Sequence, residues 1–240
     1  MTIDAELAAP VVTEQPTLLP GWLLRPLLRA RSLDAILRRR AADIVAKAAM
    51  DRHLPADALC LDVGAGFGHI AEILLNRAPR RHCVAIDPVW TPPDRLVRRL
   101  EQTAAGRWQF LTADGLRLPF ADGSFDAVWM AFVLHHVAYD GQWRVLDEIS
   151  RVLKPGGAFL LLEDTPATER EWAIVERADR RLNAEPRHEP HCYRSPTEWR
   201  AVLPSRGFEV TEEIAFSRVF PRASLAPVPH RAFICRKAAR

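Results

Sequence analysis

The sequence predicts a doubly wound α/β fold, a mostly parallel sheet covered by helices on both faces. Short apolar runs alternate with longer segments of helical periodicity between residues 59 and 162. The runs are apolar at nearly every position, which is typical of strands buried on both faces of a parallel sheet. Glycines directly follow the first run, as expected where a strand turns sharply into a helix.

The predicted elements follow one another in a regular order. A stripe of apolar residues over 33–49 predicts an amphipathic helix that precedes the first strand. Strands are predicted at 59–63, 82–86, 108–112, 125–132 and 158–162, and helices at 67–77, 94–103 and 140–153. Asp140 is expected to cap the start of the last of these helices, and Pro155-Gly156-Gly157 to end it.

The final third of the chain predicts a different connection. A charged helix is expected over 168–183, and Ser195-Pro196-Thr197-Glu198 forms a capping box that opens a helix ending before Gly207. Two last strands are predicted at 209–216 and 232–236. The segment between them holds three prolines and no helical pattern, which favours an antiparallel return over a parallel crossover.

The N-terminal residues 1–32 predict a tail followed by a lid segment, outside the single domain of 33–240. Residues 18–29 are rich in Leu and Trp. They could pack over the core, close over a substrate or touch a membrane surface. Pro20 and Pro26 interrupt any long amphipathic helix, which favours packing or a lid.

Composition indicates an ordinary soluble protein. Hydrophobic residues make up 48% of the chain, charged residues 26%, and the net charge is only +3, which does not suggest a dedicated nucleic-acid binder. The four cysteines lack paired or metal-binding spacing, so a reducing compartment is expected. No signal peptide or membrane-spanning stretch is recognisable, which predicts a cytoplasmic location and leaves the oligomeric state open.

The first strand leads into the glycine-rich segment Asp62-Val63-Gly64-Ala65-Gly66-Phe67-Gly68. In doubly wound sheets ligands bind at this carboxyl edge, and glycines let a ligand lie against the backbone, although a tight turn alone would also explain them. Asp87 ends the second strand, where a carboxylate can accept ribose hydroxyls. Asp114 follows the third strand and could accept from an adenine amino group or simply form a turn. The fingerprint of a dinucleotide site is missing, because position 69 is His instead of Gly.

Together these segments resemble the class I S-adenosylmethionine-dependent methyltransferases. The resemblance covers about 55–163 and is closest to the small-molecule branch that includes the ubiquinone and menaquinone C-methyltransferases. Its motifs are Asp62–Gly68, Asp87, Ala113-Asp114, Ser124–Val128, Leu134–Val137 and Leu153–Gly157. The resemblance implies a seven-stranded Rossmann-like sheet whose last strand is antiparallel, S-adenosylmethionine as the cofactor, and transfer of a methyl group to a small organic acceptor.

The resemblance also implies which residues hold the cofactor. Glycines of the first loop would line the methionine part, Asp87 would hold the ribose, and Asp114 would face the adenine. Residues after the fourth strand would lie near the sulfonium. The complete set is Asp62, Gly64, Ala65, Gly66, Gly68, Asp87, Pro88, Ala113, Asp114, Gly115, Ala131 and Phe132.

Methyl transfer from a sulfonium is an in-line displacement that needs alignment and a dry pocket, and needs a base only if the acceptor loses a proton. His135 and His136 follow the fourth strand and are the candidate catalytic residues, although packing or capping would also explain them. Asp164, His191 and Tyr193 are candidates for the acceptor pocket. No metal site is predicted, because the proline in His188-Glu189-Pro190-His191 prevents the helix that would align two ligands.

Other functions remain as alternatives. The same cofactor platform could serve a cyclase or an aminopropyl-transfer enzyme, or a non-catalytic partner subunit. Base-amino methyltransferases of nucleic acids carry Asn or Asp followed by Pro-Pro and an aromatic residue after the fourth strand, whereas this chain has Met130-Ala131-Phe132-Val133-Leu134. The Pro-Cys pair of cytosine C5 enzymes is also absent, since Cys192 follows His191.

Overall fold

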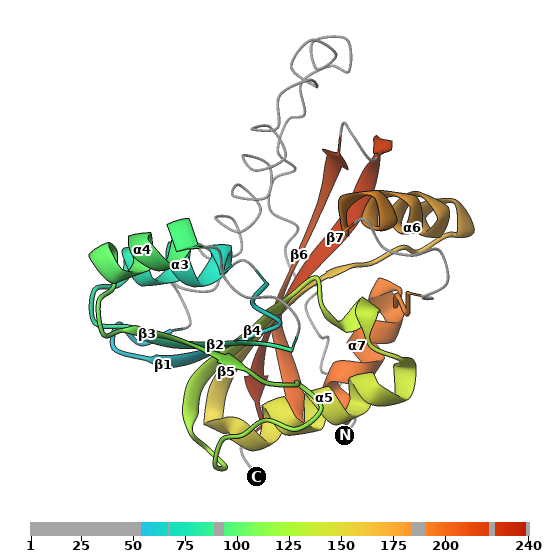
Figure 1. The fold of residues 1–240 in the computed structure, drawn as a ribbon. Coiled ribbons are helices and arrows are strands. Elements are labelled where there is room, and N and C mark those ends of the chain that lie inside the picture. Colours follow the sequence, from blue (N-terminus) through green and yellow to red (C-terminus); the bar gives the residue numbers. More distant parts are fainter. Residues whose placement is uncertain (1–53, 67, 89–93, 184–190, 221–223, 239–240) are drawn as a thin grey trace, which may run out of the picture.

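The computed structural model describes residues 54–66, 68–88, 94–183, 191–220 and 224–238 (Figure 1). The predicted tail and lid at 1–32, the predicted helix at 33–49, and His188 lie outside the described residues. Within the described ranges, no helix combines the length and the apolar character needed to cross a membrane.

One sheet of seven strands, in the order β3-β2-β1-β4-β5-β7-β6, organises the described chain. The strands are β1 (Leu59–Val63), β2 (His82–Asp87), β3 (Trp108–Thr112), β4 (Phe125–Ala131), β5 (Leu153–Asp164), β6 (Phe208–Phe220) and β7 (Ser224–Lys237). Strands β1 to β5 pair in parallel, and β7 lies antiparallel between β5 and β6. The predicted doubly wound sheet with an antiparallel last strand is confirmed.

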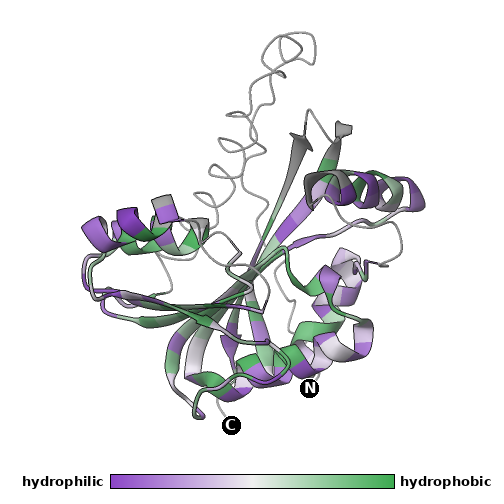
Figure 2. Cartoon of the chain, in the orientation of Figure 1, coloured by the Kyte–Doolittle hydropathy of each residue, from purple (hydrophilic) through white to green (hydrophobic). Residues whose placement is uncertain are grey.

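Helices cover both faces of this sheet (Figure 1). They are α3 (His69–Arg77), α4 (Asp94–Thr103), the 3-10 helix η1 (Leu134–His136), α5 (Tyr139–Val152), α6 (Glu169–Asn183) and α7 (Pro196–Ser205). One core lies between the sheet and α3 and α4, and a second lies between the sheet and α5 and α7. A small third cluster joins Val175 and Ala178 of α6 to Tyr193 and Val228. Figure 2 shows α3 and α4 green on the side that faces the sheet and purple outside, as expected for amphipathic helices.

Two local predictions around α5 are wrong. The residue that caps the start of α5 is Ala138, without a side-chain hydrogen bond, and Asp140 lies in the first helical turn, where its charge favours the helix dipole. The helix ends at Val152, and the Pro-Gly-Gly segment lies inside β5. Gly156 has a φ of +70°, and the register between β4 and β5 shifts beside it. These glycines therefore allow an irregularity in the pairing of β5 with β4 and do not end the preceding helix.

The last two strands form an antiparallel pair, as predicted, but they extend further than expected. Pro229 pairs with Ser217 inside the strands, where a loop is predicted from the prolines. The pairing of β7 with β5 ends at His230, and directly beyond it the N–H of Thr165 donates to the carbonyl of Pro229 at 3.1 Å, so Pro229 lies at the very end of the contact between β7 and β5. A missing N–H is tolerated at such a position. Elsewhere the predicted elements agree with the structure apart from small shifts at their ends.

Candidate cofactor and acceptor site

The glycine-rich loop rests on the carboxyl end of β2. The N–H groups of Gly64 and Ala65 both donate to the carbonyl of Ile86 at 2.9 Å, and the Gly66 N–H donates to Oδ2 of Asp87 at 2.9 Å. Gly66 and Asp87, which follow or end separate strands and are both predicted to bind the cofactor, are therefore in direct contact. The Asp87 side chain is buried, with 5% of it exposed.

Positive φ angles are what make this loop possible. Gly64, Gly66 and Gly68 have φ values of +72°, +50° and +71°, where a side chain is strained. A Cβ on Gly64 would meet Cγ2 of Val133 at 2.4 Å, whereas a Cβ on Gly66 would meet no described atom within 4 Å. Gly64 is thus required by packing, whereas the space beside Gly66 holds none of the described atoms and can receive a ligand.

Asp62 is a buried carboxylate in β1, two residues before this loop. It is 2% exposed, and burial raises its pKa to about 7, with the nearby Asp87 carboxylate adding to the rise and Trp129 and the backbone of Ala71 opposing it. Its Oδ2 has no hydrogen-bond partner of normal distance and angle among the described residues, although the Trp129 side chain and the Ala71 backbone lie near enough to the carboxyl group to favour its charged form. A buried acceptor without a donor is costly, and the natural explanation is a ligand that supplies the donor.

The third strand ends at the same edge. Thr112, the last residue of β3, pairs with Asp87 in the sheet, and Asp114 comes two residues after Thr112. Asp114 therefore lies just past the carboxyl end of β3, at the same edge of the sheet as Asp87. Asp114 is exposed, and its Oδ1 accepts the N–H of Leu116 at 2.9 Å, which is the turn chemistry considered as its alternative role. Of its neighbours in the predicted set, Ala113 and Gly115 are partly buried and Pro88, beyond Asp87, is exposed.

Phe132, directly after β4, is strained. It is the one described residue other than glycine with a left-handed backbone, at φ +59°. Its N–H donates to the carbonyl of Leu162 at 2.8 Å, and its ring packs edge-on against His230 with centroids 5.1 Å apart. Strain of this kind persists only where the surroundings impose it and is concentrated at functional sites. Ala131 ends β4 opposite Leu162.

Glu163, at the end of β5, organises the turn that follows β4. Its Oε1 accepts the N–H groups of Val133 at 2.9 Å and Leu134 at 2.7 Å, and its Oε2 bonds Nδ1 of His135 at 2.7 Å. Glu163 and His135 are each 1% exposed. Sequence reasoning missed Glu163, although an acidic residue closing an otherwise apolar strand could have indicated it.

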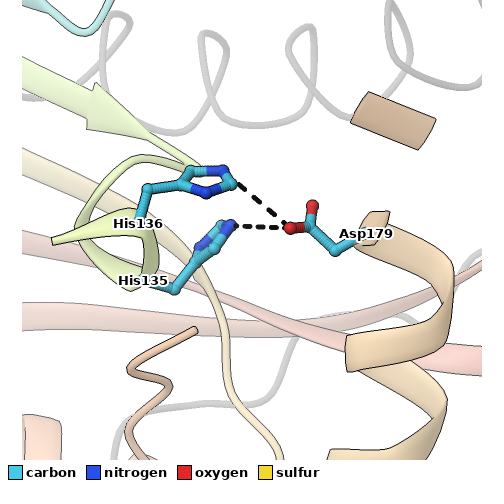
Figure 3. A group of neighbouring side chains, drawn as sticks. All are labelled: His135, His136 and Asp179. Atoms are coloured by element: carbon cyan, nitrogen blue, oxygen red, sulfur yellow. Dashed lines mark ion pairs between the residues drawn. The ribbon is translucent and has the colours of Figure 1, made fainter. Parts of the chain in front are cut away.

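Three histidines surround Asp179 of α6. The Oδ2 of Asp179 lies 3.6 Å from Nε2 of His135, 3.9 Å from Nε2 of His136 and 3.2 Å from Nε2 of His191. Figure 3 shows His135 and His136 leaving one turn toward Asp179 on a separate helix. Burial lowers the pKa of His135, but Glu163 and Asp179 outweigh it and hold this pKa well above its usual value. Asp179 was also missed, because α6 is so charged that it was interpreted as a polar helix.

The predicted pocket residues lie around this cluster. Nδ1 of His191 is 2.8 Å from Oε2 of Glu176 and 3.0 Å from the hydroxyl of Tyr193, whose ring stacks on that of His135 at 5.0 Å. Asp164 is buried and pairs with Nδ1 of His230, against which Phe132 packs. The structure thus brings His135, His191 and Tyr193 into one polar group.

Comparisons with known proteins agree with this geometry. Residues 61–161 match the family described as Methyltransferase domain. A demethylmenaquinone methyltransferase of Thermus thermophilus is 36% identical over 160 residues, which cover 66% of this chain and 67% of the relative. A ubiquinone/menaquinone biosynthesis C-methyltransferase of Dinoroseobacter shibae is 38% identical over 104 residues, 43% of this chain and 41% of that protein. The match thus spans less than half the length of the second relative.

A solved structure of an S-adenosylmethionine-dependent methyltransferase from Methanosarcina mazei superposes with a TM-score of 0.61 at 20% identity, covering 80% of this chain and 97% of that one. This structural similarity supports the fold, and the sequence similarity to the Thermus relative shows the family. The chain therefore belongs to the class I S-adenosylmethionine-dependent methyltransferases, and S-adenosylmethionine is its cofactor.

Proposed function

We propose that the carboxyl edge of β1, β2 and β4 binds S-adenosylmethionine and that a small organic acceptor enters beside the histidine cluster around Asp179. The observation that carries this proposal is the buried Oδ2 of Asp62, which has no hydrogen-bond partner of normal geometry among the described residues and belongs to the strand that leads into the glycine loop, where no described atom lies beside Gly66. A ligand with a cationic amino group would supply the missing donor and fill that space.

The residues have separate roles in this proposal. Asp62 and the glycine loop orient the methionine part, Asp87 holds the ribose, and Asp114 faces the adenine. Asp87 already accepts the N–H of Gly66, so one carboxylate fixes the loop and borders the ligand. The residues that would line the rest of the cofactor are Ala65, Gly68, Pro88, Ala113, Gly115, Ala131 and Phe132.

The bound cofactor supplies a methyl group on a sulfonium that is already a good leaving group, so the protein contributes mainly alignment and exclusion of water. The strained turn at Phe132 fixes the end of β4 beside this position, and Glu163 locks the backbone that follows. The acceptor would lie among His135, His136, Asp164, His191 and Tyr193. Because the two relatives are named for demethylmenaquinone and for ubiquinone/menaquinone synthesis, a quinone precursor is the first acceptor to test. The four free cysteines suit a reducing compartment such as the cytoplasm.

The cofactor site is tested by a matched pair of glycine variants. Gly66→Ala and Gly123→Ala both place a side chain at positive φ with no described atom within 4 Å, so each should cost about 1 kcal/mol of stability. Gly123 lies in the turn that leads into the amino end of β4, whereas the glycine loop follows the carboxyl end of the parallel strand β1, so the two glycines lie at opposite ends of the strands. Calorimetric titration with S-adenosylhomocysteine should show a loss of at least about tenfold in affinity for Gly66→Ala alone. Equal affinities for the two variants would contradict the proposed site.

A further inference from the structure

We propose that His135, His136 and Asp179 form a binding site for a divalent transition-metal ion of the zinc class, beside the acceptor region. No metal motif is recognisable in the sequence, because two ligands follow β4 and the third comes from α6 (Figure 3). One ligand atom from each residue lies within 4.8 Å of the others.

The spacing suits coordination better than direct hydrogen bonding. The Nε2 atoms of His135 and His136 are 3.6 and 3.9 Å from Oδ2 of Asp179, beyond the usual hydrogen-bond range of about 2.7–3.2 Å. Two ligand atoms that each lie ~2.1 Å from a tetrahedral ion are ~3.4 Å apart. Small side-chain adjustments would therefore place an ion between these three atoms.

The orientation of His135 gives an independent reason. Its Nδ1 is held by Glu163 at 2.7 Å, and its Nε2, in a side chain only 1% exposed, has no hydrogen-bond partner among the described residues. A histidine whose far nitrogen is fixed by a carboxylate, with the near nitrogen directed at a common point, is the usual arrangement around protein-bound zinc.

His191 repeats this arrangement from a third segment. Glu176 and the Tyr193 hydroxyl hold its Nδ1 at 2.8 and 3.0 Å, while its Nε2 lies 3.2 Å from Oδ2 of Asp179. In the metal-bound form His191 would orient Asp179 or approach the ion as a further ligand. The nearby carboxylates of Glu163 and Glu176 add negative charge that favours a divalent cation over a neutral ligand.

The exposure of His136 suggests what such an ion would do. Its side chain is 34% exposed, whereas those of His135 and Asp179 are 1% and 11% exposed, so the site opens to solvent on the His136 side. Three protein ligands with one open side are typical of zinc sites that bind water or substrate. Resting on the proposed function, the open position would take an oxygen of the acceptor and lower its pKa.

The test uses tag-free, full-length protein that has been stripped with a chelator, and Co²⁺ alone as the probe. We expect one equivalent of Co²⁺ to produce visible ligand-field bands, and Zn²⁺ to displace it with micromolar or tighter affinity. His136→Ala removes a half-exposed ligand with little risk to the fold and should weaken Zn²⁺ binding at least tenfold. His82→Ala removes an exposed histidine at the start of β2 and should leave the affinity unchanged.

A second variant distinguishes coordination from simple surface binding. In Glu163→Gln the amide N–H would donate a hydrogen bond to Nδ1 of His135, so the ring proton would sit on Nε2 and block coordination there. Zn²⁺ affinity should then fall by about 10- to 100-fold while circular dichroism stays native. The absence of cobalt bands, or equal Zn²⁺ affinities for His136→Ala and His82→Ala, would overturn the metal site. Titration of the stripped protein with S-adenosylhomocysteine separates the two proposals, because that binding does not require the metal.

Discussion

Replacing Asp62 with Asn should stabilise the protein at alkaline pH, because the carboxyl group is buried at a cost. Burial raises the pKa of Asp62 from 3.8 to about 7, so the folded state holds a proton that the unfolded state has lost between these values. The contribution of Asp62 is therefore most favourable below about pH 4 and is lost as pH rises toward and through about 7. A shift of about three units corresponds to about 4 kcal/mol when the carboxylate is fully ionised.

Asn is neutral throughout this pH range, so residue 62 of the variant does not lower the free energy of unfolding as the pH rises. Urea unfolding of both proteins from about pH 5 to about pH 8 should show their stability difference moving in favour of Asp62→Asn, by about 2.7 kcal/mol across this window, because the remainder of the loss falls below about pH 5. Asp57→Asn removes an exposed charge in the segment before β1 and controls for the change in net charge. If the wild-type and Asp62→Asn stabilities run parallel with pH, the assignment of a costly buried carboxylate is wrong.

Three further substitutions test how the site is built, each by urea unfolding at constant pH. Gly64→Ala should cost ~3 kcal/mol, because its methyl group would meet Val133 at 2.4 Å on a backbone with φ +72°. A cost no larger than that of an unclashed glycine would argue against this contact. Glu163→Ala should cost ~3 kcal/mol, since two buried N–H groups and a histidine lose their acceptor; a change under 1 kcal/mol would mean that water replaces it. Ser195→Ala should cost about 1 kcal/mol, because the serine and Glu198 cap α7 reciprocally, and an unchanged midpoint would contradict that role.

The order of elements could be predicted because each strand and helix is encoded locally. Apolar runs identified β1 to β4 almost to the residue, and the capping box at Ser195 identified the start of α7. The Pro-Gly-Gly segment at 155–157 was misinterpreted because glycine serves both helix ends and strand irregularities. Only the register against β4 decides between them, and that register is a tertiary property.

The cofactor side and the acceptor side of the site also differ in how well local sequence patterns predict them. The cofactor edge follows from short motifs at strand ends, and Asp87 and the glycine loop do meet. The acceptor side joins residues from η1, β5, α6 and the segment before α7. Asp179 and Glu176 lie in a helix so rich in charge that no local pattern separates the buried carboxylate from the solvated ones, as the predominantly purple α6 in Figure 2 illustrates. The lid and the helix expected before residue 54 stay predictions.

The most direct test of the central claim is calorimetric titration of the purified protein with S-adenosylhomocysteine, with NAD as the control ligand. We expect one molecule of S-adenosylhomocysteine to bind with micromolar affinity and NAD not to bind, because His69 stands where a pyrophosphate loop needs glycine. Failure to bind S-adenosylhomocysteine would leave the fold intact but contradict the assignment of a working cofactor site to the glycine loop that follows Asp62.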